Sequence, residues 1–341
     1  MQEPKARIGV VGGSGFIGNS LARYFSQDFD IEILDVKPPT SSLNRSVSFR
    51  YCDVRSYENL RNALSDVDLV FHTAIVQIPQ INEDKRLAYE VNILGTQNVC
   101  EAVRSLPEAK GMILAGSWHA MGERELSGTV DEEFGFRPDK VEDRARLYSL
   151  SKMAQEAITR FYDEMSEKFY GIIRTGTVLG EGMPEKTAAN IFIERGINGK
   201  TLTPYRHSMH RPMLYVDVGD VCTAYASLSR KILKSETGKS GGSRSHIVNI
   251  YYPSPVSVLE LAEMVRDSVA SCTGGKVNPR IEIIDQDLPV LFSREDKSRM
   301  RVDVSRAKKL LGITSLLSPE ESIERIVRSR LGKGPNRSTS E

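Results

Sequence analysis

Three glycines, Gly12, Gly15 and Gly18, stand three residues apart in the row VVGGSGFIG, directly after a short apolar run. The run 8–11 is typical of a buried strand, and residues 16–25 have helical spacing, so the glycines fall in a strand-to-helix turn. In such a turn the first glycine permits a tight bend, the second lets backbone approach a pyrophosphate, and the third lets helix and strand pack closely. The row therefore predicts a dinucleotide-binding site.

Short apolar runs alternate with helix-length segments through the first half of the chain. Because strands separated by helices imply right-handed crossovers, the sheet should be parallel. The predicted fold class is α/β, a Rossmann-type doubly wound parallel sheet with a smaller α/β C-terminal substrate lobe. The strands are expected at 8–11, 31–34, 47–51, 69–73, 111–115 and 170–174, and the helices of this half at 16–25, 87–105 and 149–169.

Beyond residue 174 the pattern loosens into Gly, Pro and loop signals, with isolated helices expected at 188–198, 256–271 and 319–330. The expected domains are a dinucleotide-binding domain at 1–175, to which 212–250 returns, and a substrate lobe at 176–211 and 251–330. Two stretches are predicted to lack regular structure, a Gly/Ser/Lys surface loop at 234–245 and a disordered tail at 331–341.

The charges of the 341-residue chain nearly cancel, with 46 basic and 45 acidic side chains. No overall field should draw it to nucleic acid or to an anionic membrane, so a small molecule is the expected partner. Its uncharged apolar runs are shorter than the roughly 18 to 20 residues of a membrane span. Four cysteines without a Cys-x-x-Cys pair or a secretory signal predict reduced thiols in a soluble cytoplasmic protein.

Asp35 ends the second predicted strand, in the row IEILDV. A carboxylate at that point can accept both hydroxyls of a ribose and would repel a 2′-phosphate. The aspartate therefore favours NAD over NADP, and the nearby Lys37 weakens that preference.

Tyr148 and Lys152 are four residues apart in a predicted helix, so both side chains project from one face. A tyrosine with its ordinary pKa of about 10 is a poor base at neutral pH, and a neighbouring cation favours the phenolate. Ser117 follows the strand 111–115 but lacks the Gly-x-Ser-x-Gly elbow of a hydrolase nucleophile. The three residues predict proton transfer at a hydroxyl or carbonyl group.

The glycine row and the Tyr-x-x-x-Lys spacing together resemble the extended short-chain dehydrogenases/reductases, in particular the NAD-dependent epimerase/dehydratase family with its nucleotide-sugar epimerases. The resemblance implies that Ser117 bonds the reacting oxygen, that Tyr148 is the general base, and that Lys152 lowers the tyrosine pKa and bonds the nicotinamide ribose. It implies NAD as cofactor, held by Gly12, Gly15, Phe16, Ile17, Gly18, Asp35, Asp53, Val54, Thr73, Ala74, Asn92, Tyr148 and Lys152.

Basic residues of the second half are candidates for holding a substrate phosphate, because a guanidinium presents its donors as a rigid fork. Arg211, ahead of the row MLYVDVGDV, is the first candidate, and Arg301 or Arg294 is the second. The alternative for this basic cluster is a surface patch.

Histidines have open roles at this stage. His119 is assigned to substrate binding, with a bulky pocket wall as the equal alternative, and His72 suits either a catalytic role or a satisfied, partly buried side chain. His207 and His210 lack acidic or cysteine co-ligands nearby, so no metal site is expected.

Some departures from the family pattern bear on the substrate. The Asp-Glu pair of sugar dehydratases is missing beside Trp118, and Arg206-His207-Ser208 replaces an expected Gly-x-Gly. The charged insert 139–146 is interpreted as a solvated helix or loop.

The leading hypothesis is therefore an NAD-dependent nucleotide-sugar epimerase or related oxidoreductase. The alternative is a one-way dehydrogenase or reductase acting on a substrate without a nucleotide, which the missing glycines and the bulky Trp118 favour. A non-catalytic NAD-binding scaffold is a third hypothesis. Family analogy implies a homodimer formed through segments 87–105 and 149–169.

Overall fold

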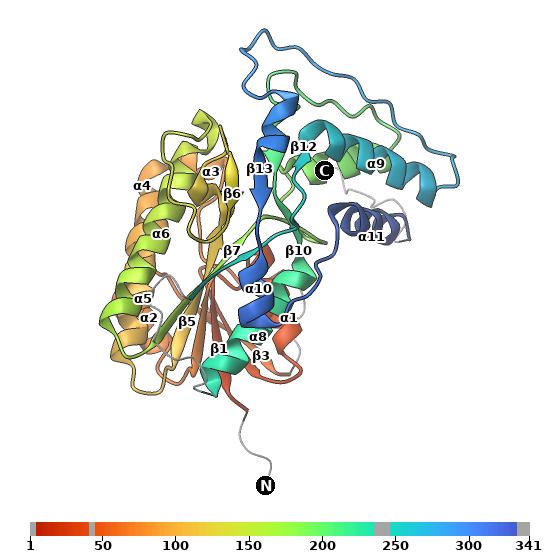
Figure 1. The fold of residues 1–341 in the computed structure, drawn as a ribbon. Coiled ribbons are helices and arrows are strands. Elements are labelled where there is room, and N and C mark those ends of the chain that lie inside the picture. The colour runs from red at the N-terminus through yellow and green to blue at the C-terminus, as the bar shows by residue number, and fades with distance from the viewer. Residues whose placement is uncertain (1–4, 41–44, 235–245, 333–341) are drawn as a thin grey trace.

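The structure, a computed structural model, describes residues 5–40, 45–234 and 246–332. Within these ranges seven strands form one parallel sheet in the order β3-β2-β1-β4-β5-β7-β11 (Figure 1). This arrangement confirms the predicted α/β class and the doubly wound parallel sheet. The strands are β1 (Arg7–Val11), β2 (Asp30–Asp35), β3 (Val47–Tyr51), β4 (Leu69–His72), β5 (Gly111–Ser117), β7 (Phe169–Thr175) and β11 (Ile247–Ile250).

Both faces of the sheet are covered, as a parallel sheet requires. Neighbouring residues of one strand point to opposite faces, so Val10 and Val11 of β1 belong to two separate apolar clusters. One face is covered by α2 (Tyr57–Ala63), α5 (Gly95–Ser105) and α6 (Arg146–Met165), and the other by α1 (Phe16–Phe25) and α8 (Val218–Leu233) (Figure 1).

Two of the helices expected in the first half of the chain differ from the observed ones at their limits. The helix expected at 87–105 is formed by α4 (Lys85–Tyr89), the π-helical turn η1 (Glu90–Leu94) and α5. The helix expected at 149–169 begins at Arg146 and ends at Met165, because Ser166 takes an extended conformation and the chain enters β7 at Phe169.

The C-terminal part of the chain packs three helices together, α7 (Ala188–Ile197), α9 (Val258–Cys272) and α11 (Pro319–Gly332). α9 begins at a capping box in which the Ser257 hydroxyl accepts from the Glu260 backbone and the Glu260 carboxylate accepts from the Ser257 backbone. The remaining elements are α3 (Gln80–Glu83), η2 (Trp118–Met121), β6 (Gly128–Val130), η3 (Asp143–Ala145), β8 (Thr177–Leu179), β9 (Pro212–Met213), β10 (Tyr215–Asp217), β12 (Val256–Ser257), η5 (Arg294–Arg299), β13 (Met300–Val302) and α10 (Ser305–Leu311).

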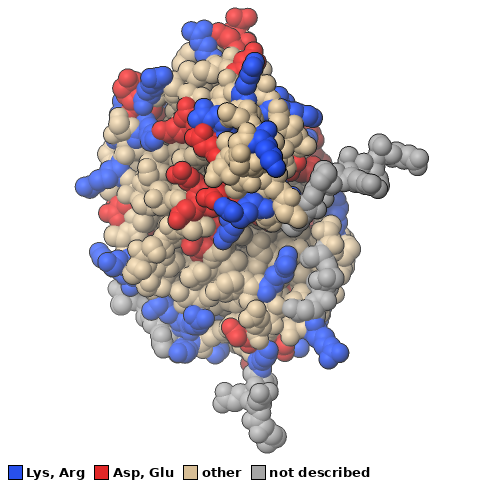
Figure 2. All heavy atoms as spheres, turned by 90° about the vertical axis from the view of Figure 1, so that its right-hand side faces the viewer, with Lys and Arg blue, Asp and Glu red and all other residues tan. Residues whose placement is uncertain are grey.

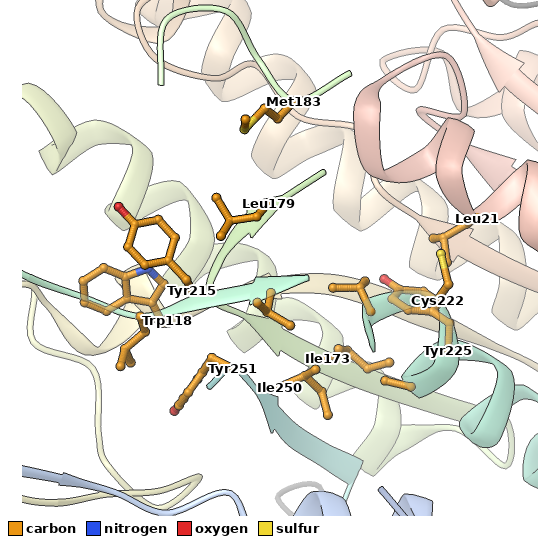
Figure 3. Packing of buried hydrophobic residues seen from close by; sticks show 14 of the residues in the cluster. Leu21, Trp118, Ile173, Leu179, Met183, Tyr215, Cys222, Tyr225, Ile250 and Tyr251 are labelled. Carbon is orange, nitrogen blue, oxygen red and sulfur yellow. The ribbon is translucent and has the colours of Figure 1, made fainter. Parts of the chain in front are cut away.

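The larger apolar cluster extends from the sheet into this C-terminal part (Figure 3). Trp118, Tyr215 and Tyr251 are fully or almost fully buried in it. At its other end the ring of Tyr225 on α8 meets the ring of Phe71 on β4 edge-on, with centroids 5.0 Å apart. Because this cluster is continuous, the C-terminal helices are fixed relative to the strand ends.

Acidic and basic side chains are interspersed on the face that Figure 2 shows. None of the described helices is both long and apolar enough to cross a membrane. The expected surface loop lies outside the described residues from 235 to 245, and so does the expected tail from 333 onward. Leu331 and Gly332, which were expected to begin that tail, belong to α11.

Candidate active site

A large cavity, lined by described residues, runs along the carboxyl ends of the sheet strands and continues between them and α7. Its volume is about 1080 Å³. We call the part lined by residues of 12–55 and 73–80 the sheet half, and the part lined by residues of 119–144 and 184–213 the lobe half. Ligands of doubly wound sheets bind beyond the carboxyl ends of the strands, which makes this cavity the candidate site.

The glycine row forms a backbone cradle in the sheet half. Gly12 takes a φ of +79°, and a Cβ there would lie 2.4 Å from the Ala74 nitrogen. A Cβ at Gly18 would lie 2.5 Å from the carbonyl oxygen of Gly12. Gly15 precedes α1 without a capping side chain, so the first N–H groups of the helix face the cavity. With Phe16 and Ile17, which also line the cavity, this cradle fits the pyrophosphate of a dinucleotide.

Asp35 lies at the end of β2 and lines the same half. Its Oδ2 accepts from the backbone N–H of Ser14 at 3.1 Å, and its Oδ1 accepts from that of Lys37 at 3.2 Å. These bonds orient the carboxylate while leaving further lone pairs free, so it suits the hydroxyls of a ribose.

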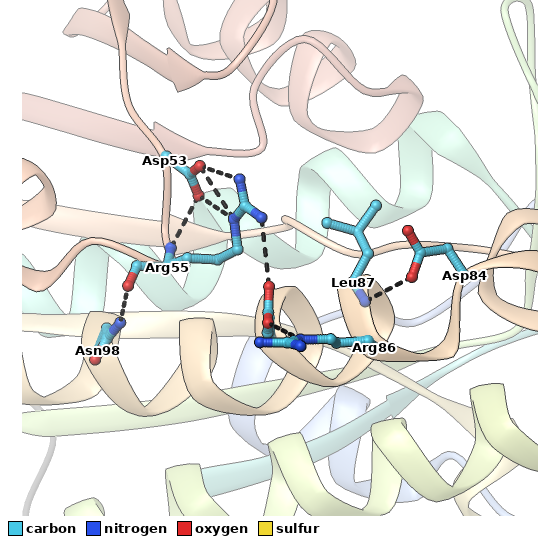
Figure 4. A network of polar contacts seen from close by, with 7 residues as sticks. Asp53, Arg55, Asp84, Arg86, Leu87 and Asn98 are labelled. Atoms are coloured by element: carbon cyan, nitrogen blue, oxygen red, sulfur yellow. Dashed lines mark hydrogen bonds and ion pairs between the residues drawn. The ribbon is translucent and has the colours of Figure 1, made fainter.

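Asp53 and Val54 line the cavity beyond Asp35, where a charged network supports the wall (Figure 4). The Arg55 guanidinium donates to both carboxylate oxygens of Asp53, with Nη2 to Oδ2 at 2.6 Å, and this hydrogen bond lowers the pKa of Asp53. Asn98 on α5 donates to the Val54 carbonyl oxygen at 2.9 Å. The segment that follows β3 is thereby fixed to α5.

Thr73 and Ala74 follow β4 and lie against the glycine cradle. The Thr73 hydroxyl donates to the carbonyl oxygens of Val11 and Gly12, at 2.9 and 3.1 Å. It therefore holds the turn, whereas Ala74 supplies the surface that Gly12 approaches.

Asn92, expected to contact the cofactor, is fully buried in η1 behind the cavity wall and does not line the cavity. Its Oδ1 accepts from the Val76 N–H at 2.7 Å, and its Nδ2 donates to the Val76 carbonyl and to the Ser151 hydroxyl, each at 3.1 Å. Asn92 thus joins the loop after β4 to α6, and supports the site from outside.

His72 is fully buried at the end of β4 and does not line the cavity. Its Nε2 is 2.8 Å from the Thr96 hydroxyl. Burial, together with the charge of Lys152, lowers the pKa of His72 to about 3, so the ring is neutral. These observations favour the structural role for this histidine.

Ser117, Tyr148 and Lys152 meet where the sheet half adjoins the lobe half. β5 ends at Ser117, and α6 carries both other side chains on one face. The Lys152 ammonium lies 6.0 Å from the centre of the Tyr148 ring and donates to the Ala115 carbonyl oxygen at 2.8 Å. The Ser117 side chain is near enough to the tyrosine to lower its pKa.

Burial sets the acid–base properties of this trio. It raises the pKa of Tyr148 to about 12, against the opposing effect of the Ser117 side chain. Burial lowers the pKa of Lys152 to about 7, so the lysine can exchange its proton near neutral pH.

Charged side chains form the wall of the lobe half. Arg211 donates from Nη1 to Glu142 Oε1 at 2.6 Å, and Arg144 donates from Nε to Glu142 Oε2 at 2.8 Å. Glu142 is almost fully buried, whereas Arg144 remains partly exposed beside the cavity. Arg211, the expected phosphate-binding residue, therefore lies at the cavity with its charge already balanced by a carboxylate.

His119 also lines the lobe half and has two polar partners. Its Nε2 lies 3.1 Å from Glu123 Oε1, and its Nδ1 lies 3.2 Å from the Ser117 hydroxyl. Glu123 is fully buried. The ring of His119 meets the ring of Tyr148 edge-on, with centroids 5.5 Å apart.

Sequence reasoning missed Glu123, Glu142 and Arg144. The insert 139–146 was interpreted as solvated, but its Glu142 is buried and two of its residues line the cavity. A signal was present for Glu123, because it stands four residues after His119 and just after Gly122.

Two candidates for substrate phosphate, and the tryptophan that was taken to narrow the pocket, lie elsewhere. Arg301 is on β13, where its Nη2 donates to the Thr129 hydroxyl at 2.8 Å, and it does not line the cavity. Arg294 lines a separate, shallower groove beside Tyr252. Trp118 is fully buried in the apolar core instead of narrowing the pocket, so its bulk gives no argument about the substrate.

No group of three or more His, Cys, Asp or Glu residues is placed to hold a metal ion in the part of the chain that the structure describes. His207 lines the cavity with its ring stacked on that of Tyr205, at 5.9 Å between centroids.

Comparisons with known proteins identify the family of the chain. The model of the family described as NAD dependent epimerase/dehydratase matches residues 8–249. A putative UDP-glucose 4-epimerase of Methanocaldococcus jannaschii is 27% identical over 76% of this chain and 81% of its own length. The bovine sterol-4-alpha-carboxylate 3-dehydrogenase, decarboxylating, is 30% identical over 58% of this chain and 53% of its own.

Solved structures show the same fold. The UDP-glucose 4-epimerase of Thermus thermophilus, in complex with NAD, matches with a TM-score of 0.75 and 24% identity, over 96% of this chain and 99% of that one. The UDP-glucuronic acid 4-epimerase of Bacillus cereus, in complex with UDP-glucuronic acid and NAD, matches with a TM-score of 0.74 and 20% identity, over 95% and 99%. By its sheet, its glycine cradle and the family match over most of its length, the chain belongs to the NAD dependent epimerase/dehydratase family.

Proposed function

We propose that this enzyme is an NAD-dependent nucleotide-sugar epimerase, or a closely related sugar-nucleotide oxidoreductase, with Tyr148 as general base. The observation that carries the proposal is the meeting of Ser117, Tyr148 and Lys152 between the two halves of the cavity. A cofactor in the sheet half and a sugar in the lobe half would both reach these side chains. Relatives with UDP-sugars in their names support this choice of substrate.

In this proposal Tyr148, as phenolate, accepts the proton of a sugar hydroxyl, and the Ser117 hydroxyl holds the same oxygen. Lys152 favours the phenolate when it carries a proton, and its pKa of about 7 lets it gain or lose that proton at working pH. NAD, when bound, would supply the acceptor and donor of the hydride. The cradle at Gly12 and the Asp35 carboxylate hold it in place.

A one-way dehydrogenase or reductase without a nucleotide substrate is the second candidate. It is favoured by the Arg211–Glu142 pair, because a diphosphate would have to compete with a buried carboxylate for the guanidinium. A neutral hydroxyl or ketone substrate would leave this pair intact.

The purified protein, once denatured, can be tested by mass spectrometry for released NAD(H) and nucleotide sugar. Near-stoichiometric NAD, with a nucleotide sugar, supports a cofactor that is recycled in place, as in an epimerase. Protein that is empty of both and binds added NAD weakly supports the one-way enzyme instead.

The Tyr148→Phe variant tests the general base. We expect turnover to fall by about a thousandfold, because general acid–base catalysis contributes roughly 10² to 10⁴. NAD affinity, measured by calorimetry, should change little and serves as the control. Turnover close to that of the parent protein would remove Tyr148 from the mechanism.

We also propose a homodimer formed through α5 and α6. The outward face of α6 carries Leu150, Phe161 and Met165, with Phe161 57% and Met165 52% exposed. An apolar helix face of this kind favours pairing with a second copy. A Phe161→Asp variant should shift the mass measured by light scattering from dimer to monomer.

Two further proposals concern organisation. We propose that 1–175 with 212–250 forms the cofactor domain, since β11 extends the main sheet, and that 176–211 with 251–330 forms the substrate lobe.

We propose a cytoplasmic location, which the four free cysteines favour and which cell fractionation can test.

A further inference from the structure

The Arg144 guanidinium lines the lobe half of the cavity and keeps hydrogen-bond donors that no described residue uses. Its side chain is 44% exposed, whereas the two carboxylates that hold it are buried. Nε donates to Glu142 Oε2 at 2.8 Å, and Nη2 donates to Glu123 Oε1 at 3.4 Å. Toward the described residues these bonds use two of the five N–H donors of an arginine. Donors on Nη1 and Nη2 are therefore left for a ligand.

The chain around Arg144 is held in place from two sides. Asn82 on α3 donates from Nδ2 to the Arg144 carbonyl oxygen at 2.9 Å. On the other side the Glu123 backbone N–H donates to the Lys140 carbonyl oxygen at 2.7 Å, and the Glu142 backbone N–H donates to Glu123 Oε2 at 3.3 Å. The guanidinium is thus fixed before a ligand arrives, so little side-chain freedom is lost on binding.

Arg144 lies close to the side chains that are assigned to the reacting hydroxyl. It precedes Tyr148 by four residues, about one helical turn, and both residues line the cavity. Glu123 Oε1, which accepts from Arg144, also lies 3.1 Å from His119 Nε2, and His119 Nδ1 lies 3.2 Å from Ser117 Oγ. In a nucleotide sugar the ring separates the diphosphate from the hydroxyls on its far side. An anion that binds Arg144 therefore belongs to the sugar itself.

The charges of the lobe half match a single negative charge. Arg144, Arg211 and Lys186 line the cavity, with Glu142 beside them and the buried Glu123 behind. With histidines counted as neutral, these described residues carry one positive charge in excess. One carboxylate balances that excess, whereas a phosphate monoester brings roughly 1.5 to 2 negative charges. The wall therefore suits a carboxylate better than a phosphate.

We propose that Arg144 is a specificity-determining residue that binds a carboxylate of the substrate, beside the hydroxyl that reacts. The substrate class is then a sugar acid of the uronic acid kind, free or joined to a nucleotide. This inference rests on the proposed function, because it takes Ser117 and Tyr148 as the groups that act on the hydroxyl. A guanidinium and a carboxylate pair through two parallel hydrogen bonds, which fix the orientation of the sugar as well as its position.

This pairing needs no rearrangement of the wall. The carboxylate takes donors of Arg144 that Glu142 leaves free, so the pair of Glu142 with Arg211 stays intact. A neutral sugar offers no charge to these donors and should bind more weakly.

The first experiment measures binding by calorimetry with NADH present, because NADH cannot accept a hydride from an alcohol. The probes are pairs of an acid and its neutral sugar: glucuronic acid with glucose, galacturonic acid with galactose, and the UDP derivatives of all four. In at least one pair the acid should bind about thirtyfold more tightly, as expected for charge-assisted hydrogen bonds. A preference among the UDP derivatives alone identifies a nucleotide-linked acid, and one among the free sugars identifies a free sugar acid.

Equal affinities within every pair, or no binding of any acid, would overturn the proposal. Glucose 6-phosphate tests the kind of anion, since it carries a phosphate at the carbon where glucuronic acid has its carboxylate. Tighter binding of glucose 6-phosphate than of the acids would also overturn the proposal.

The second experiment repeats the measurement with variants of Arg144. In Arg144→Met the affinity for the acid should fall about thirtyfold and that for the neutral sugar by less than about threefold, so that the preference disappears. Arg144→Lys keeps the charge without the fork, and about a fivefold loss is expected for the acid alone. The matched control is Arg146→Met, since Arg146 pairs with the exposed Asp143 and does not line the cavity.

The affinity for NADH reports whether each variant is folded. A preference for the acid that survives in folded Arg144→Met would overturn the proposal. If Arg144→Met does not bind NADH, Arg144→Lys decides, and an acid affinity equal to that of the parent protein would then contradict the proposal.

Turnover, measured separately with NAD, distinguishes this inference from the proposed function. An acid that binds through Arg144 but is neither oxidised nor epimerised would remove the proposed function and leave the carboxylate site. Turnover of a neutral nucleotide sugar without any preference for the acid would leave the proposed function and remove the carboxylate site.

Discussion

The two halves of the cavity are built from different material. The sheet half is formed largely by backbone, namely a glycine turn, strand ends and the first turn of a helix, and its charged side chains are Asp35, Lys37, Asp53 and Arg55. The lobe half is side chain, with Glu142, Arg144 and Arg211 brought together from separate segments. The backbone cradle suits a dinucleotide, which many different proteins bind. The side-chain charges of the lobe half can be changed one residue at a time, and such changes would alter the substrate that is bound. The difference predicts that mutations in one half leave the ligand of the other half bound.

The largest effect should come from Gly12→Val in the sheet half. A Cβ at Gly12 collides with the Ala74 backbone, and valine tolerates the positive φ poorly. We expect NAD affinity, measured by calorimetry, to fall by about a hundredfold, equivalent to roughly 3 kcal/mol. The control is Gly135→Ala, because a Cβ there meets nothing within 4 Å. Unchanged NAD binding in Gly12→Val would place the cofactor elsewhere.

Arg211→Met should act on the lobe half alone. Loss of a charge-assisted hydrogen bond costs about 2 kcal/mol, so KM for a phosphorylated substrate should rise about thirtyfold while the Kd of NAD stays constant. Arg301→Met is the matched control, since Arg301 lies outside the cavity. If Arg211→Met leaves KM unchanged, the one-way enzyme without a nucleotide substrate becomes the better hypothesis.

Lys152 lies at the junction, and its burial should be visible in the stability of the protein. The pKa of Lys152 falls from 10.5 to about 7 on burial, so between these pH values the unfolded chain binds a proton that the folded chain does not. The free energy of unfolding should therefore rise with pH across this window.

Lys152→Met removes this dependence. Relative to the parent protein it should be more stable at pH 6, by on the order of 2 kcal/mol, and the advantage should vanish toward about pH 10. Urea unfolding at several pH values measures the difference. Exposed Lys309→Met is the control, and an advantage that does not vary with pH would argue against a depressed lysine pKa.

The smallest effect is expected from Asp35→Asn, which keeps the shape of the side chain and removes its charge. NAD should bind about fivefold more weakly, and the preference over NADP should shrink, because the 2′-phosphate is no longer repelled. Asp30→Asn, at the exposed start of the same strand, is the matched control. A preference that does not change would mean that Lys37 or the loop after it sets the selectivity.

The sheet half could be predicted from the sequence because its chemistry depends on chain geometry. Glycine is required at positions 12 and 18 because backbone atoms of other residues lie too close for a Cβ. Asp35 is the last residue of β2, so the end of this strand fixes the position of its carboxylate. Both facts are local. The parallel sheet followed for the same reason, from the alternation of strands and helices.

The lobe half could not be predicted in the same way, because its structure depends on contacts between residues that are far apart in the sequence. Glu142 is buried because it meets Arg211, which lies far along the chain, and a charged segment taken alone is usually solvated. Arg301 was the second candidate for a phosphate ligand after Arg211, and the sequence did not show that β13 holds it away from the cavity. The neighbouring residues in the sequence also did not show that the Trp118 side chain is buried in the apolar core.

The position of β11, the last strand of the main sheet along the chain, affects how the protein folds during its synthesis. β11 pairs with β7, yet the chain forms α7, α8 and several loops before Ile247 reaches its partner Ile172. During synthesis the edge of β7 therefore stays open long after α6 has left the ribosome, and an open edge can pair with another chain. A nascent chain that stops short of Ile250 would hold the cofactor cradle and the tyrosine but carry an unprotected sheet, so we expect such fragments to aggregate before they can act.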